Sequence, residues 1–189
     1  MKRSLFFALL LAATITSAQD RWTLELRGGT SSATTDFGSA NLKTGLGIEG
    51  TVAYRFMPNL SAYAGWGWNH FGADPTPAEE KLDFEETGYT VGLQFVHPIG
   101  ESTLSYRLGA GAVFNHVEVE NSAGDKVADT GHGAGWQLEA GLEIPLSTSM
   151  VLVPDVRYRS LPREMTTGST TTAADLNYIS VGVGFVWSL

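Results

Sequence analysis

The sequence predicts an all-β fold, an eight-stranded antiparallel transmembrane up-and-down β-barrel, and three observations predict it. The final residues, 179–189, place apolar side chains at every second position with mostly small residues between them. Seven earlier segments alternate with the same period of two. Short turns and long polar loops then alternate along the chain. This combination is typical of a closed barrel in lipid, with apolar side chains outside and small or polar ones lining the lumen.

The N-terminal segment, residues 1–18, is interpreted as an export signal. Lys2 and Arg3 precede an apolar run over residues 5–13. Thr16, Ser17 and Ala18 then supply the small residues that a signal peptidase reads. The run is too short to cross a bilayer as a helix. We therefore expect one domain, a barrel over residues 19–189.

Composition excludes several classes of function. The chain has 12 Lys and Arg against 20 Asp and Glu, a formal net charge of −8. This negative charge argues against binding to nucleic acid. It has no Cys, so it forms no disulfide, thiolate metal site or lipid-modified cysteine. We expect no cofactor.

The first four expected strands cover residues 22–30, 42–56, 60–71 and 84–96. Each has an apolar face and an opposite face of polar or small residues. The apolar faces include, in order, Trp22, Leu24 and Leu26; Leu46, Ile48 and Val52; Ala62, Ala64 and Trp66; and Tyr89, Val91 and Leu93. The opposite faces include Glu25 and Arg27; Gly47 and Glu49; Tyr63 and Gly65; and Thr90 and Gln94.

The last four expected strands cover residues 103–117, 133–144, 150–160 and 179–189. Their apolar faces include Leu104 and Leu108; Leu138 and Leu142; Leu152 and Val156; and Val181, Val183 and Phe185. The opposite faces include Arg107 and Gly109; Gln137 and Glu139; Asp155, Arg157 and Arg159; and Gly182 and Gly184. Pro154 lacks an N–H, and a closed barrel has no free edge, so we expect a bulge or local irregularity there.

The connections orient the barrel. Short turns are expected at residues 57–59, 97–102 and 145–149, and long polar loops at 31–41, 72–83, 120–132 and 161–175. In such barrels short turns face the periplasm and long loops face outside. An even number of strands then places both termini on the periplasmic side of a bacterial outer membrane.

Aromatic side chains fall near both ends of the expected strands, as the two membrane interfaces favour. Near the periplasmic ends are Trp22, Phe56, Phe95, Tyr106 and Trp187. Near the outer ends are Trp68, Phe84, Phe114, Trp136 and Tyr158.

Charged side chains on the inward face are nearly balanced in sign. The acids are Glu25, Glu49, Glu139, Glu143 and Asp155, and the bases are Arg27, Arg55, Arg107 and Arg157. Gly-x-Gly pairs on the same face leave room for these long side chains in a barrel that is only just wide enough to be filled. We expect one coupled network of ion pairs that plugs the lumen, formed by Glu25, Arg27, Glu49, Arg107, Glu139, Asp155 and Arg157. A gated narrow pore or proton path is the alternative.

The four histidines are expected to be solvated, and we expect no metal site. They are His70, His97, His116 and His132. The alternative is that His116 and His132 approach one another across the third long loop, near Glu118 and Glu120. The loop acids are expected to form a solvated rim, with weak divalent-cation binding alongside lipopolysaccharide as the alternative. They are Asp74, Glu79, Glu80, Asp83, Glu118, Glu120, Asp125 and Asp129.

No arrangement of residues predicts an enzyme. A lipid A-modifying barrel places Ser two residues after a lipid-facing His, but here Glu118 follows His116 and Ala134 follows His132. Glutamates in a packed lumen have no room for a substrate. The spacing reveals no Ser–His–acid set.

The terminal pattern Gly184-x-x-Trp187-x-Leu189, with the strand pattern, resembles the small outer-membrane barrels of the OmpA/OmpX/opacity-protein type. Family members commonly end in Phe, and Leu189 departs from this. The resemblance implies a barrel in membrane lipid, in contact with lipopolysaccharide, whose last strand is recognised by the barrel-assembly machinery. It implies a non-enzymatic role in envelope integrity, adhesion or host contact through four loops, without a periplasmic domain. A narrow, porin-like channel is the alternative. The fourth loop, including residues 165–174, is expected to be a mobile tip or a partner surface.

Overall fold

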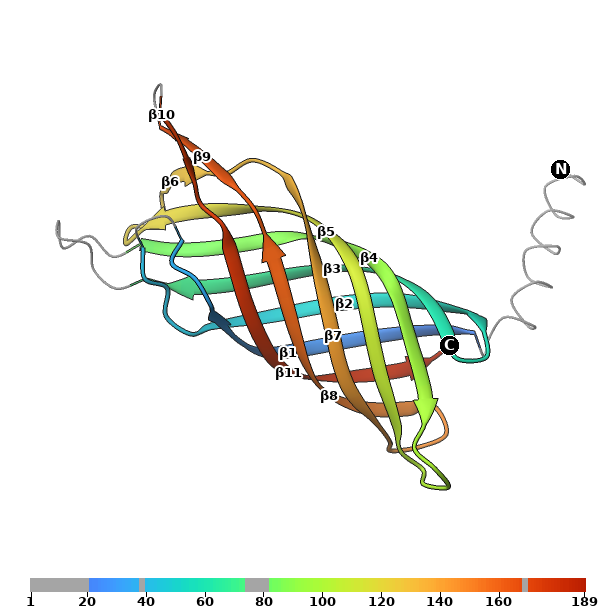
Figure 1. Cartoon of the computed structure of the whole chain (residues 1–189). Coiled ribbons are helices and arrows are strands. Elements are labelled where there is room, and N and C mark those ends of the chain that lie inside the picture. Colours follow the sequence, from blue (N-terminus) through green and yellow to red (C-terminus); the bar gives the residue numbers. More distant parts are fainter. Residues whose placement is uncertain (1–20, 38–39, 74–81, 168–169) are drawn as a thin grey trace, which may run out of the picture.

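Eight strands pair side by side into a closed antiparallel barrel, as the sequence predicts (Figure 1). Their order around the barrel is β1, β2, β3, β4, β5, β7, β8 and β11, and β11 pairs with β1 to close the ring. The computed structural model describes residues 21–37, 40–73, 82–167 and 170–189. The expected export signal, residues 1–18, and the loop acids Asp74, Glu79 and Glu80 lie outside them. In this part of the chain, no helix is long and apolar enough to cross a membrane.

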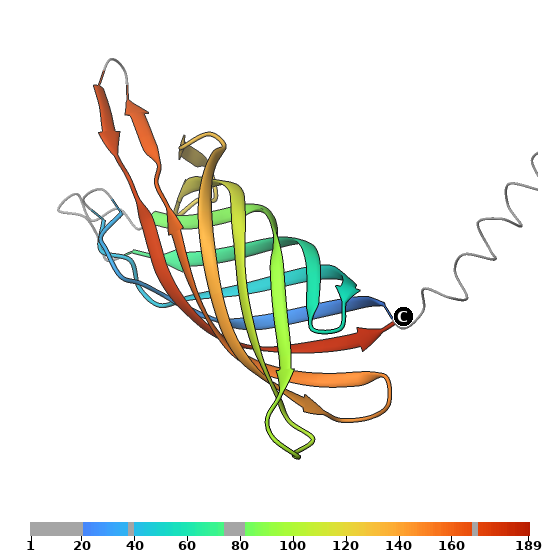
Figure 2. The same ribbon diagram turned by 45° about the vertical axis from the view of Figure 1, so that its right-hand side comes forward.

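The eight barrel strands are β1 (Trp22–Ala33), β2 (Gly45–Met57), β3 (Leu60–Gly72), β4 (Leu82–Pro98), β5 (Ser105–Asn121), β7 (Gly133–Pro145), β8 (Met150–Leu161) and β11 (Leu176–Ser188). Three shorter strands lie in the long connections, namely β6 (Lys126–Asp129), β9 (Glu164–Thr167) and β10 (Thr170–Ala173). β6 pairs with β5, and β9 pairs with β10 as a hairpin that projects beyond the barrel (Figure 2).

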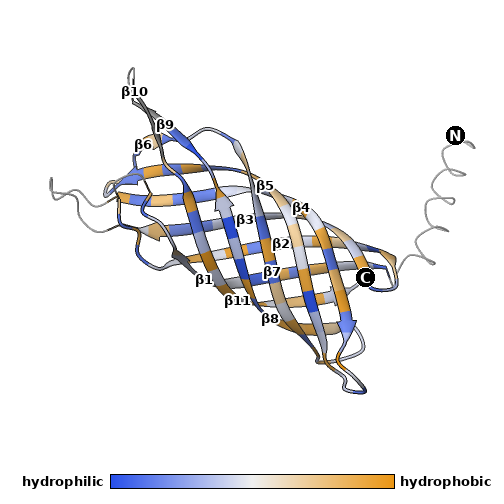
Figure 3. Cartoon of the chain, in the orientation of Figure 1, coloured by the Kyte–Doolittle hydropathy of each residue, from blue (hydrophilic) through white to orange (hydrophobic). Residues whose placement is uncertain are grey.

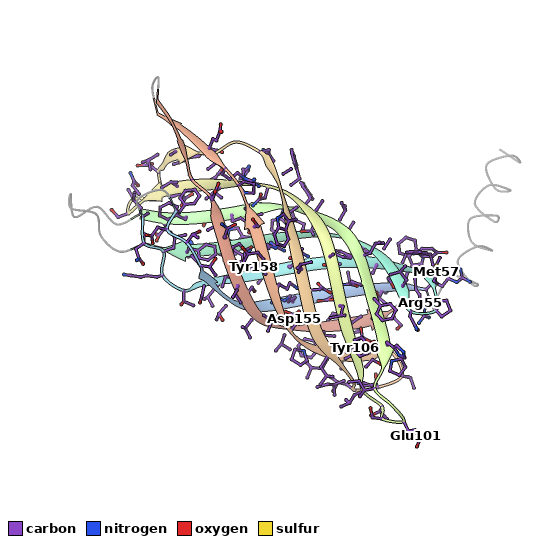
Figure 4. All side chains as sticks on the ribbon, viewed as in Figure 1. Arg55, Met57, Glu101, Tyr106, Asp155 and Tyr158 are labelled. Atoms are coloured by element: carbon purple, nitrogen blue, oxygen red, sulfur yellow. The ribbon has the colours of Figure 1, made fainter. Side chains whose placement is uncertain are left out.

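The two ends of the barrel differ. The C-terminus and the three short turns lie at one end, which we call the turn end, and β6, β9 and β10 lie at the other, the loop end (Figure 1). Arg55, Met57 and Glu101 mark the turn end in Figure 4. Along the barrel wall, orange and blue residues alternate in Figure 3, because successive side chains of a strand point to opposite faces.

Several strands extend farther into the loop end than the sequence analysis expects. β5 ends at Asn121 instead of residue 117, and β11 begins at Leu176 instead of residue 179. In this part of β5 the apolar Val117 and Val119 are buried, whereas Glu118 is only partly buried. Apolar side chains thus face inward here and polar ones outward, which is the pattern of a sheet in water. A prediction based on outward apolar residues therefore makes these strands too short at the loop end.

The outward aromatic residues include one wrong prediction. Phe84 is only 2% exposed and lies inside the barrel, because it shares the inward face of β4 with Glu86. The other predicted aromatics are exposed or partly exposed, namely Trp22, Phe56, Trp68, Phe95, Tyr106, Phe114, Trp136, Tyr158 and Trp187. In Figure 4, Tyr106 lies nearer the turn end than Tyr158.

Pro154 interrupts one ladder without shifting it. On the β7 side the pairing stops at Gly141–Asp155 and resumes in the same register at Ile144–Leu152. On the β11 side Pro154 lies opposite Val183 in continuous pairing. The expected irregularity is therefore a gap in pairing, and the structure shows no register shift between these two strands.

Candidate functional site

The interior of the barrel carries a layer of buried charged side chains, which we call the polar layer. β1 contributes Glu25 and Arg27, β2 Glu49, β5 Arg107, β7 Glu139, and β8 Asp155 and Arg157. Each of these residues is between 2% and 6% exposed. The period of two directs all of them inward, and the closure of β1 on β11 brings the first and last strands together.

Arg157 lies among four carboxylates in the middle of the polar layer. Its Nη2 is 3.0 Å from Glu25 Oε1 and 3.3 Å from Asp155 Oδ2. Its Nε is 3.4 Å from Glu139 Oε2, and its Nη1 donates to Glu49. A buried charge of either sign is tolerated only when it is paired in this way.

Arg27 and Arg107 extend the network to further carboxylates. The Nε of Arg27 donates to both carboxylate oxygens of Asp155, at 2.8 and 2.9 Å. The Nη1 of Arg107 lies 2.5 Å from Glu25 Oε2, and its Nη2 lies 2.9 Å from Glu143 Oε1. Glu25 and Asp155 therefore each connect one of these arginines to Arg157.

Sequence reasoning missed a second group of side chains, nearer the loop end. The Nη2 of Arg159 donates to Glu49, and its Nη1 donates to the hydroxyl of Tyr178 at 3.1 Å. The Tyr178 hydroxyl in turn donates to Glu86 Oε2 at 3.1 Å. Asn69 and Asn115 also donate to Glu86, at 2.7 and 2.6 Å.

A signal for these residues was available. Arg159 and Glu86 have the inward parity of β8 and β4. Tyr178 was missed because the last strand begins at Leu176, whereas the sequence predicts a start at residue 179. Arg55, expected among the inward bases, is exposed at the turn end.

Glycines make room for the charged side chains. A Cβ on Gly109 would lie 2.5 Å from Glu139 Cγ, and one on Gly182 would lie 2.6 Å from Arg27 Cζ. Both distances are too short for a side chain to be added without movement of its neighbour. The Gly-x-Gly pairs therefore have a packing role, as the sequence analysis expects.

An apolar layer, which sequence reasoning did not anticipate, covers the polar layer at the loop end. Its buried members are Phe37, Phe71, Ala73, Phe84, Val113, Val117, Val119, Leu161, Ala174, Leu176 and Tyr178. The ring centroids of Phe71 and Tyr178 lie 5.4 Å apart, in an edge-to-face arrangement. Because the Tyr178 hydroxyl binds Arg159 while its ring packs on Phe71, this side chain joins the two layers.

A small cavity lies in the polar layer. It is bordered by Arg27, Glu49, Arg157 and Tyr178 among others, and it has a volume of about 10 Å³. This is about enough for one water molecule. Two buried polar atoms of the polar layer, Glu139 Oε2 and Arg157 Nε, form no hydrogen bond with described residues, although they lie 3.4 Å apart.

A larger cavity, of about 420 Å³, lies at the loop end. It is lined by Thr130, His132, Gly133, Pro162, Arg163, Glu164 and Asp175. The guanidinium of Arg163 donates to the carbonyl oxygens of Gly133 and Ala134, at 2.8 and 3.1 Å. This arginine therefore fastens the start of the fourth long connection to β7.

The histidines lie apart from the polar layer. His116 and His132 meet at the loop end, with their Nδ1 atoms 3.4 Å apart. His70 lies 3.6 Å from Glu85 and 3.9 Å from Asp83. His97 packs near Tyr106 at the turn end, with ring centroids 5.6 Å apart.

Comparisons with known proteins agree with the barrel. The sequence model of one protein family, described as outer membrane protein beta-barrel domain, matches residues 5–188. Comparison with curated protein sequences finds no match.

Several solved structures have a similar fold. Neisserial surface protein A is 14% identical, with a TM-score of 0.63, over 89% of this chain and 97% of that one. OprG from Pseudomonas aeruginosa is 15% identical, with a TM-score of 0.57, over 90% and 98%. Ail of Yersinia pestis, in complex with the heparin analogue sucrose octasulfate, is 16% identical, with a TM-score of 0.50, over 88% and 99%. At these identities the likeness concerns the fold alone.

Proposed function

Because the chain belongs to the outer membrane protein β-barrel domain family, we propose that it is a non-enzymatic barrel with a closed lumen that acts through its loops. Its role is in envelope integrity, adhesion or host contact at the bacterial surface. The observation that carries this proposal is the pair of stacked interior layers, ion-paired toward the middle and apolar toward the loop end.

The two layers oppose passage for different physical reasons. Opening the polar layer would separate Arg157 from its carboxylates, and a buried charge without a partner is strongly unfavourable. Opening the apolar layer would expose Phe71, Phe84 and Leu161 to water. Because the layers are in series, a solute would have to displace both.

The proposal includes an orientation. The loop end faces outside, in contact with lipopolysaccharide, and the turn end faces the periplasm, after removal of residues 1–18 as an export signal. The terminal strand β11 ends at Ser188, one residue before Leu189. It is the segment that the assembly machinery recognises. These assignments follow from the length of the connections and the family of the chain.

The charge of the loop end restricts its partner. Glu118, Glu120, Asp125 and Asp129 lie there with the bases Lys126 and Arg163, in a chain of net charge −8. This excess of acids disfavours a polyanion such as the heparin analogue bound by Ail, so for the loops, apart from the lipopolysaccharide that surrounds the barrel, we propose a neutral or cationic surface ligand. The cavity lined by His132, Arg163 and Glu164 is the concave feature at this end to which such a ligand would fit.

A narrow channel is the second candidate. The small polar cavity and the unbonded atoms of Glu139 and Arg157 favour it, because they are places where water could enter the polar layer. The apolar layer argues against it in the observed conformation.

Thiol accessibility separates these two functions. The chain contains no Cys, so a single introduced Cys is the only thiol that a reagent can modify. Val117→Cys places the thiol in the apolar layer, where Val117 is 0% exposed, and Val127→Cys places it on β6, where Val127 is 54% exposed. A membrane-impermeant thiol reagent should modify Val127→Cys quickly and Val117→Cys at least about 100-fold more slowly. Similar rates for both would favour the channel.

The surface role is tested in cells that lack the protein. The full chain should restore the barrier of the envelope or attachment to surfaces. A variant with residues 164–173 replaced by a short Gly-Ser turn should keep the heat-modifiable gel migration of a folded barrel but lose attachment. If that variant restores attachment fully, this loop is not the contact surface.

A further inference from the structure

A compact group of polar side chains lies on the outer face of the third long connection. His116 and Glu118 are two residues apart on β5 and so point to the same side. β6 pairs with β5, and Asp129 lies directly opposite Glu118. One ligand atom from each of these three residues lies within 4.8 Å of the other two.

Lys126 already places a positive charge in this group. Its Nζ donates to Glu118 Oε1 at 2.8 Å and to Asp129 Oδ2 at 2.5 Å. These hydrogen bonds raise the pKa of Lys126 above its usual value. Partial burial acts to raise the pKa of Asp129, but bonds from Lys126 and the Gly131 backbone outweigh it and hold this pKa below its usual value. The two carboxylates are therefore arranged around a cation.

The imidazole of His116 is oriented by a second histidine. Its Nδ1 lies 3.4 Å from Nδ1 of His132, and its Nε2 lies 3.7 Å from Glu118 Oε1. One ring nitrogen is thus engaged by His132 while the other faces the carboxylates. Metal-ligating histidines commonly have this arrangement, in which a neighbouring group binds the nitrogen that does not ligate.

We propose that His116 Nε2 and the carboxylates of Glu118 and Asp129 bind a divalent transition-metal ion such as Zn²⁺, in the place that the Lys126 ammonium occupies here. An imidazole with two carboxylates suits zinc and its neighbours, whereas Ca²⁺ and Mg²⁺ prefer oxygen ligands alone. Lys126 is exposed, so its side chain leaves for solvent without disturbing the barrel. The bound ion links β5 to β6 and stiffens the third loop.

His70 provides a matched control. It also lies between two acids, but Glu85 approaches its Nδ1 and Asp83 approaches its Nε2. The two nitrogens of one imidazole point in different directions, so these acids and one ring nitrogen do not converge on a single ion. The inference therefore concerns the geometry at His116, and not the general presence of histidine beside acids.

The test is calorimetric titration of Zn²⁺ into the untagged chain refolded in detergent micelles. His116→Gln should weaken binding at least about tenfold, as loss of a ligand does. Lys126→Gln should tighten it, because the competing ammonium is gone. His70→Gln should leave the affinity unchanged. Heat-modifiable migration confirms that each variant is folded.

Three results would overturn the assignment. One is an affinity for Zn²⁺ that His116→Gln leaves unchanged, and another is an equal loss in His70→Gln. The third is binding of Ca²⁺ as tight as that of Zn²⁺ and independent of His116, which would show a site made of carboxylates alone. If Lys126→Gln does not tighten binding, its ammonium does not occupy the place of the ion.

Discussion

Arg157 is the residue on which the interior charges converge, since Glu25, Glu49, Glu139 and Asp155 all lie around it. Arg157→Gln should lower the free energy of unfolding by about 3–5 kcal/mol, because it leaves buried carboxylates without their partner. Unfolding of the refolded barrel in denaturant measures this. Glu101→Gln, in the exposed turn between β4 and β5, should change it by no more than about 0.5 kcal/mol. Equal effects of the two variants would contradict the proposed network.

Glu139→Gln combined with Arg157→Gln tests whether the side chains are coupled. The double variant should lose less stability than the two single losses added together, because it removes both charges of a buried pair. The measurement is a double-mutant cycle in the same denaturant. Strict additivity would mean that the 3.4 Å approach of these side chains contributes nothing to stability.

At the inward glycines, an added methyl group should lower the stability of the barrel. Gly109→Ala should destabilise the barrel by about 1–3 kcal/mol, because its Cβ would overlap Glu139. Gly50→Ala is the control, since beyond its own and its two adjacent residues no described atom lies within 4 Å of the position of its Cβ. Its effect on the same unfolding measurement should stay within about 0.5 kcal/mol. A similar loss in both would point to backbone effects rather than packing.

At this scale, the period of two predicts which face of a strand carries each side chain, but not which side chains pair. Parity directs Glu49 and Arg157 inward. It cannot tell that Arg159 is buried whereas Arg55 is exposed, because that depends on how far each lies from the end of its strand. The partners of Tyr178 depend on contacts between β11, β8 and β4, which the sequence does not list.

At the scale of the strands, the sequence predicts the membrane-facing parts well because lipid selects apolar side chains at every second position. It predicts the loop-end parts poorly. There the inward face becomes apolar, as Val117 and Val119 show, and the outward face becomes polar. The aromatic belt fails for the same reason at Phe84, which lies in this part of β4.

The outward face of β11 gives a direct test of the strand assignment. Val183 is exposed on the barrel wall, opposite Pro154 of β8. Val183→Arg should reduce the stability of the membrane-inserted barrel by about 2–4 kcal/mol, because it places a charge on the lipid face. Ile99→Arg, in the exposed turn between β4 and β5, should have little effect on folding into lipid vesicles. Equal folding yields for both variants would mean that Val183 does not face lipid.

At the scale of the whole molecule, the proposed closed lumen depends on two layers that form by different means. The polar layer needs residues from β1, β2, β5, β7 and β8, so it exists only when the ring is closed. The apolar layer combines the loop-end parts of the strands with Phe37, Ala73 and Ala174 of the connections. The sequence predicts the closed ring and the inward charges, but the apolar layer depends on how the connections pack against the loop-end parts of the strands.

The measurement that tests this closed lumen most directly is electrical recording of the refolded chain in planar lipid bilayers. With the polar and apolar layers in series, the protein should insert without a steady conductance, apart from rare brief openings. A steady and reproducible conductance, proportional to the number of inserted molecules, would contradict the closed lumen and assign the narrow channel to this barrel.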